Sequence, residues 1–155
     1  MGKFRYKQSM IYKKLVKENL DFSRKKDVLS SLGIGSRKLI KDWLDEMGIE
    51  HYMINDDLTI DALDVHLANS ELVMLPDYIQ FNSANIFNCD TNRLISLRGC
   101  PKRVRSNFNC FDNHLTSLDG CPEFVGGYFD CEDNYEMFSE SDVTDRCVVN
   151  GDIYI

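Results

Sequence analysis

Two stretches of the chain decide its fold: residues 87–104 read FNCDTNRLISLRGCPKRV, and residues 108–125 read FNCFDNHLTSLDGCPEFV. The copies are 21 residues apart and agree at their Phe, Cys, Asn, Leu, Ser, Gly, Pro and Val positions. A third copy begins at Phe129 and keeps Cys131 and Asn134 before the match is lost. Self-similarity at a period of about 20 to 29 residues predicts a solenoid of stacked coils.

The Phe-x-Cys element predicts one short strand in each coil, with alternate side chains on opposite sides. We expect Phe108 and Cys110 to face the core and Asn109 to face out, and the sister copies to do the same. Asn113 suits a turn, because its amide can bond the backbone of its own coil and of the adjacent one. The Gly-Cys-Pro that follows is expected to close each coil, since Gly reaches backbone angles that other residues resist and Pro fixes φ.

This pattern resembles the leucine-rich repeats of the short bacterial type, with Phe and Cys where Leu and Val or Ile are commoner. The resemblance covers residues 60–138. Residues 52–76 also resemble the opening segment of leucine-rich-repeat-like proteins of tailed bacteriophages. There Val65, Leu67, Leu72 and Leu75 align with the first good copy at an offset of 22 residues. The resemblance implies a solenoid scaffold, and a scaffold alone does not specify function.

The segments on either side of the repeat are predicted to cap it. Apolar periodicity predicts helices from residue 9 to 20, from residue 23 or 27 to 32, and from Ser36 to Met47, where Gly48 ends the last one. Residues 52–54 and 58–60 suit a strand, a turn and a strand. The predicted fold class is therefore α+β: a helical N-terminal cap over residues 1–50, a leucine-rich-repeat-like solenoid over residues 51–138 and a C-terminal β cap over residues 139–155.

The C-terminal cap is predicted to be a β-hairpin. Residues 147–155 read CVVNGDIYI, two apolar runs around Asn150-Gly151. Asn-Gly is the strongest short hairpin signal, because both residues tolerate positive φ. We expect this hairpin to cover the apolar coil that ends at Phe129 and Cys131.

Charge is unevenly distributed along the chain. Residues 1–50 contain 12 Lys and Arg against 7 Asp and Glu, whereas residues 51–155 contain 6 against 18. A negatively charged solenoid repels nucleic acid and favours a basic partner, although charge also serves solvation alone. No apolar run reaches the roughly 18 residues of a membrane span, and the first residues do not resemble a signal peptide, so we expect a cytoplasmic protein with no membrane partner.

The cysteines and histidines offer little support for catalysis or metal binding. Six cysteines permit a disulfide framework, but a repeated internal position explains five of them as buried thiols, and only Cys147 lies outside that pattern. Zinc is disfavoured because C-x-x-C is absent. His51, His66 and His114 fall in different coils, beside no recognisable nucleophile. We expect no enzyme, no cofactor and no metal.

What remains is a surface for protein–protein interaction. In leucine-rich repeats the concave sheet displays the variable residues. The predicted partner-binding residues here are Asn88, Asp90, Asn109, Phe111, Asp112, Tyr128, Asp130, Glu132 and Asp133. Phe111 occupies the place of Asp90 and Glu132 in the sister copies, so it is either an exposed anchor or packs sideways on a neighbouring coil. The phage resemblance implies a host protein as partner and a role as an inhibitor, including of host defence, or as an adaptor in the host cytoplasm.

The alternative function is DNA binding by the basic front of the chain. Residues 27–44, DVLSSLGIGSRKLIKDWL, loosely resemble a helix-turn-helix, in which Ser36, Arg37, Lys38 and Lys41 would meet the DNA. A capping helical hairpin with solvated lysines explains the same segment. The acidic remainder would oppose DNA binding.

Overall fold

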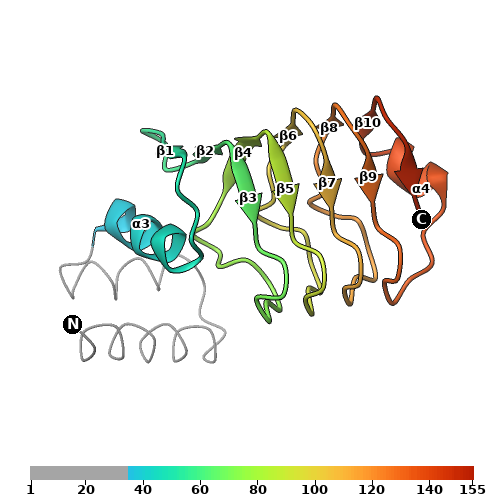
Figure 1. Cartoon of the computed structure of the whole chain (residues 1–155), viewed down its shortest axis with the longest axis horizontal. Coiled ribbons are helices and arrows are strands. Elements are labelled where there is room, and N and C mark those ends of the chain that lie inside the picture. Colours follow the sequence, from blue (N-terminus) through green and yellow to red (C-terminus); the bar gives the residue numbers. More distant parts are fainter. Residues whose placement is uncertain (1–34) are drawn as a thin grey trace. The chain divides into compact units, whose positions relative to one another are not determined.

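A computed structural model describes residues 35–155, and residues 40–155 within it form one compact unit. This unit is a β-solenoid in which successive coils stack their strands into two sheets (Figure 1). The helices predicted between residues 9 and 32, and residues 27–34 of the helix-turn-helix-like segment, lie outside the described residues.

Sheet A has six strands in the order β1-β2-β4-β6-β8-β10. Its strands are β1 (Tyr52–Ile54), β2 (Ile60–Ala62), β4 (Phe81–Ala84), β6 (Arg103–Val104), β8 (Phe124–Val125) and β10 (Val148–Val149). Sheet B has five strands in the order β11-β9-β7-β5-β3. They are β3 (Asp64–His66), β5 (Ile86–Asn88), β7 (Phe108–Asn109), β9 (Phe129–Asp130) and β11 (Ile153–Tyr154). All neighbouring strands are parallel except β1 and β2.

Each coil contains two strands, so the prediction of one strand per coil is wrong. The chain runs along sheet A, turns a corner and continues along sheet B, as from β6 to β7. Val104 and Val125 pair across sheet A and are fully buried, as Phe108 and Phe129 are in sheet B. The repeated Val of the sequence pattern therefore belongs to a second strand that has its own inward side chain.

The predicted core is confirmed. The Phe87 and Phe108 rings stack with centroids 5.8 Å apart, and the Phe108 and Phe129 rings lie 5.0 Å apart. The Cys110 thiol donates a hydrogen bond to the Asp130 carbonyl of the next coil, 3.2 Å away. The degenerate first copy belongs to the same stack, since Val65 pairs with Phe87.

All six cysteines are free, and five of them are buried. Burial raises the pKa of Cys131 to about 12 and that of Cys121 to about 11. Both thiols therefore stay protonated at neutral pH. Cys147, which the sequence placed outside the ladder, is buried beside the same core.

The predicted asparagine ladder is also confirmed. The Asn113 amide donates to the Cys89 carbonyl of the previous coil and to the Cys110 carbonyl of its own, at 3.0 and 3.2 Å. Its Oδ1 accepts from the Leu94 amide at 2.9 Å. The same bonds recur one coil on at Asn134. Each asparagine side chain thus forms hydrogen bonds with backbone N–H and C=O groups that water cannot reach, at the point where the coil leaves sheet B.

Left-handed backbone recurs at two positions of the repeat. The residue before each ladder position has positive φ: Asn69, Thr91, Asp112 and Asp133 lie between 49° and 53°. Gly99 and Gly120 both have φ of 90°, as the Gly-Cys-Pro element predicts. A Cβ on Gly99 would also lie 2.6 Å from the Ile79 carbonyl oxygen, so glycine is required there on both counts.

The N-terminal end of the unit is closed by a helix and a hairpin. Helix α3 (Ser36–Glu46) ends one residue before the predicted Met47, and Gly48 follows with φ of 71°. Its Ile40, Trp43 and Leu44 are buried in the core. The predicted strand–turn–strand is present as the antiparallel pair β1 and β2, whose second strand begins at Ile60 and not at Leu58.

The prediction of a C-terminal β-hairpin is wrong. Strand β10 pairs in parallel with β8 in sheet A, and β11 pairs in parallel with β9 in sheet B. Asn150-Gly151 is therefore the corner of a further, incomplete coil, in the place that Gly126-Gly127 occupies one coil earlier. An unpredicted helix, α4 (Glu140–Thr144), precedes this coil; Ser139 caps it and Val143 is buried.

Candidate functional site

The outer side of sheet B, with the turns that leave it, is here called the acidic face. It comprises residues 64–69, 86–91, 107–112, 128–133 and 152–155, which contain seven carboxylates and no lysine or arginine. The carboxylates are Asp64, Asp90, Asp112, Asp130, Glu132, Asp133 and Asp152. Because the coils stack about 4.8 Å apart, these groups lie close together. Such a face attracts cations and repels phosphate backbones.

One predicted row of the face supports the turns as well as the surface. Asn88, Asn109 and Asp130 are paired in register across three strands. Each side chain accepts a hydrogen bond from the backbone amide two residues later, at 3.0, 2.9 and 3.1 Å. These residues are therefore half-buried turn formers, and an amide serves there as well as a carboxylate.

A second row contains Asp90, Phe111 and Glu132. The sequence left two alternatives for Phe111, an exposed anchor or a ring packed on a neighbouring coil. The Phe111 side chain is half-buried, which lies between the two. Asp90 Oδ2 accepts from the Thr91 hydroxyl at 3.0 Å, while its Oδ1 is buried and has no partner in the described part of the chain. A ring and an unsatisfied carboxylate oxygen therefore belong to the same row, and Glu132 is exposed.

The negative charge is concentrated on the last coils. Burial, together with the charges of Glu132, Asp90 and Asp133, raises the pKa of Asp130 above its usual value. The rings of Tyr128 and Tyr154 meet edge to face with centroids 5.7 Å apart. The nearby Asp152 carboxylate raises the pKa of the Tyr154 phenol. Tyr154 and Asp152 were not among the predicted partner-binding residues, because their segment was predicted to be a hairpin.

The remaining predicted residues, Asp112 and Asp133, are exposed in the left-handed turns. The structure thus brings all nine predicted partner-binding residues together on sheet B and the segments that adjoin its strands. It adds Asp64 and His66 at the β3 edge and Asp152 and Tyr154 at the β11 edge.

The cations of the solenoid lie elsewhere. Lys102, Arg103 and Arg105 are exposed in and beside β6 of sheet A. Arg103 lies over the Phe124 ring, 4.2 Å from its centroid. The cations of sheet A are therefore gathered in and beside one strand, whereas the acidic face of sheet B has none.

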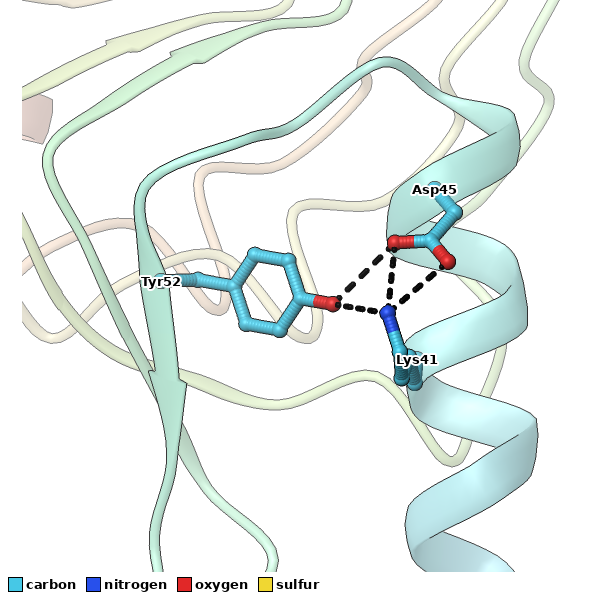
Figure 2. A network of polar contacts seen from close by, with 3 residues as sticks. All are labelled: Lys41, Asp45 and Tyr52. Carbon is cyan, nitrogen blue, oxygen red and sulfur yellow. Dashed lines mark hydrogen bonds and ion pairs between the residues drawn. The ribbon is translucent and has the colours of Figure 1, made fainter.

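Of the predicted DNA-contacting residues, Lys41 is engaged within the protein. Its ammonium group lies 3.0 Å from the Asp45 carboxylate and 3.4 Å from the Tyr52 hydroxyl, and this hydroxyl donates to Asp45 at 3.2 Å. Figure 2 shows the three side chains turned toward one another. The hydrogen bond to Asp45 has the largest effect on the pKa of Lys41, which it raises, and the hydrogen bond to Tyr52 raises it further. Ser36, Arg37 and Lys38 lie on the same helix. The network fastens α3 to β1 and supports the capping interpretation more than DNA contact.

Within residues 35–155, no group of three or more His, Cys, Asp or Glu side chains is arranged to hold a metal ion. His114 stacks on Tyr135 in the next coil, with centroids 4.3 Å apart. No helix in this part of the chain is long and apolar enough to cross a membrane.

Comparison with known proteins gives no relative from which a function could be transferred. No protein family, no curated protein and no solved structure matches the chain.

Proposed function

We propose that this protein is a non-catalytic protein-interaction module whose acidic face binds a basic segment of a partner protein. One observation supports this most strongly: five adjacent strands and their turns contain seven carboxylates and no cation, whereas the other sheet has its cations together. Solvation alone would not require such a separation of charge. The phage resemblance extends the proposal to a host protein as partner and to an inhibitor or adaptor in the host cytoplasm.

The aromatic residues supply the apolar part of the contact. Tyr128 and Phe111 are half-buried and Tyr154 is 42% exposed, so all three can lose further surface to a partner. Amphipathic and aromatic side chains are enriched among the residues that dominate binding. A partner with lysine or arginine around an apolar anchor fits both features.

The direct test neutralises the acidic face without disturbing the fold. Asp130→Asn combined with Glu132→Gln and Asp152→Asn removes three charges, and Asn at 130 keeps the turn acceptor that Asn88 and Asn109 provide in the sister coils. The intact protein and the variant are immobilised and exposed to bacterial lysate, and captured proteins are identified by mass spectrometry. We expect capture to be lost in the variant while stability stays within about 0.5 kcal/mol.

A matched control separates the face from net charge. Glu123→Gln, Glu136→Gln and Glu140→Gln remove three charges from exposed residues outside the acidic face. This control should capture the same proteins as the wild type. Equal capture by all three proteins, or equal loss in both variants, would count against the proposal.

Phe111→Ala tests the apolar anchor. If Phe111 contacts the partner, its loss should weaken binding by more than about 1 kcal/mol and leave the unfolding midpoint nearly unchanged. A lower unfolding midpoint with unchanged affinity would instead show that the ring packs only against its own coils.

A further inference from the structure

We propose that the outer side of sheet A is a second docking surface, which binds an acidic protein segment that carries an apolar side chain. The surface lies in and beside β6, β8 and β10 and is here called the basic patch; it comprises Lys102, Arg103, Arg105, Phe124 and Val148. This inference does not depend on the acidic face or on its basic partner. Together with the acidic face, the patch would let one protein join a basic partner to an acidic one.

The first observation is that the three cations of the patch are unpaired. Residues 51–155 contain six lysines and arginines, and three of them stand within four consecutive positions in and beside β6. All three are exposed, and no residue of the described chain forms an ion pair with them. By contrast, Arg93 pairs with Glu71 at 3.5 Å, and Arg146 pairs with Asp119 at 3.7 Å. Because like charges this close repel one another, the patch is stabilised by an anionic partner.

The second observation is that apolar surface adjoins these cations. Phe124 pairs across sheet A with Arg103 on one side and with Val148 on the other. The Arg103 guanidinium lies over the Phe124 ring, 4.2 Å from its centroid, and this contact holds the charge in place. Phe124 is half-buried and Val148 is 62% exposed, so both can lose further surface to a partner.

The third observation is that the carboxylate in the same row of the sheet is engaged elsewhere. Asp61 lies two strands from Arg103, with Ser83 paired between them. Its carboxylate accepts hydrogen bonds from Asn55 and Asn82, both at 2.9 Å, and from the Ser83 hydroxyl. These bonds hold Asp61 on its own side of the sheet, and the Arg103 guanidinium keeps its donors for a partner.

These features select an acidic protein segment as the occupant. Carboxylates can pair with each arginine through two parallel hydrogen bonds, and an apolar side chain of the same segment can cover the apolar part of the patch. A nucleic acid fits less well. Residues 102–105, 123–126 and 147–150 contain one carboxylate, Glu123, which a peptide can face with a neutral residue but a uniformly charged phosphate backbone cannot. Three cations also provide few of the phosphate contacts from which nucleic-acid affinity is built.

The experiment measures the binding of a fluorescein-labelled peptide in which glutamates flank one leucine and one tryptophan. Fluorescence anisotropy with the intact protein should show saturable binding that weakens as salt is added, because salt screens the attraction. Lys102→Gln combined with Arg103→Gln and Arg105→Gln should raise the dissociation constant at least about tenfold. Phe124→Ala should raise it about fivefold, because the apolar contact is lost.

The other three cations of the solenoid provide a matched control. Arg93→Gln combined with Arg98→Gln and Arg146→Gln removes the same charge outside the patch, and this variant should bind the peptide as the wild type does. The variant with the neutralised acidic face should bind it at least as tightly as the wild type, so the two proposals are tested separately. Thermal unfolding verifies that each variant is folded.

Three outcomes would overturn the proposal. They are a wild type that does not bind the peptide, an equal loss in the patch variant and in the matched control, and tighter binding of a single-stranded oligonucleotide or of phosphatidylserine vesicles than of the peptide.

Discussion

The coil of β6 and β7 and the incomplete coil of β10 and β11 have the same two strand positions but different surroundings. The coil of β6 and β7 has a neighbouring coil on each side, and its inward Val104 and Phe108 are fully buried. The last coil has a neighbour on one side, and its inward Val149 and Ile153 are half-buried. A coil of this solenoid thus obtains its stability from the interfaces with its neighbours. A single substitution should therefore cost more in a coil that has two neighbours, and the loss of a whole coil should cost most.

Removal of the last coil should have the largest effect. Deletion of residues 147–155 would uncover Val125, Phe129 and Cys131, all now buried, and would remove the buried Cys147. We expect aggregation on expression or on mild heating, because new sheet edges and a full apolar coil become exposed together. Light scattering on the truncated chain measures this. A truncated chain as soluble and stable as the wild type would mean that the last coil contributes nothing to the stack.

The asparagine ladder allows the same comparison at one residue. Asn113 is 2% exposed and lies between two complete coils, whereas Asn134 makes equivalent bonds at the partly exposed end. Asn113→Ala would leave several buried backbone groups unpaired and should lower the free energy of unfolding by about 3 kcal/mol or more. Asn134→Ala should cost clearly less, because water can reach its partners. Urea unfolding of both variants decides this, and equal losses would contradict a dependence on neighbours.

The cysteine ladder gives a smaller effect. Cys110→Ser places a hydroxyl where the thiol now donates to the Asp130 carbonyl, so the new group has a partner. The remaining cost is the loss of a polarisable apolar atom from a buried stack, and we expect about 1 kcal/mol in urea unfolding. A loss well above about 3 kcal/mol would show that the hydroxyl does not make this bond.

The repeat alone predicted the stack, the inward Phe and Cys, the asparagine bonds and the positive φ of Gly99 and Gly120. These features follow from local geometry that recurs at a fixed spacing. The second strand was missed because in the two clearest copies, at β6 and β8, it is only two residues long and contributes a single inward Val. The C-terminal coil was missed because α4 lengthens the spacing from 21 to 24 residues, as between Phe129 and Ile153.

A signal for the last coil was present in the sequence. Val125-Gly126-Gly127-Tyr128-Phe129 and Val149-Asn150-Gly151-Asp152-Ile153 share an apolar residue, a glycine-containing corner and a second apolar residue. Local turn preference favoured a hairpin at Asn150-Gly151, but pairing with the preceding coil decided the outcome. Five of the seven acidic residues of the face were predicted, because the repeat and the alternation of strand side chains indicate which positions face outward. Their supporting bonds could not be found, since these depend on the exact path of the turn.

The smallest predicted effect concerns Asp130, on the outer side of the stack. Burial raises its pKa above the ordinary value of 3.8, so the folded protein binds this proton more tightly than the unfolded chain does. Stability contributed by this group is therefore present at low pH and lost as the pH rises through the folded pKa.

Asp130→Asn keeps an acceptor for the Glu132 backbone amide, as Asn109 does for the Phe111 backbone amide. The variant should be slightly more stable than the wild type at neutral pH and should lose this advantage when the carboxyl is protonated. Urea midpoints at neutral pH and below the ordinary carboxyl pKa measure the difference, and a variant less stable at neutral pH would show that the charge strengthens the turn more than burial opposes it.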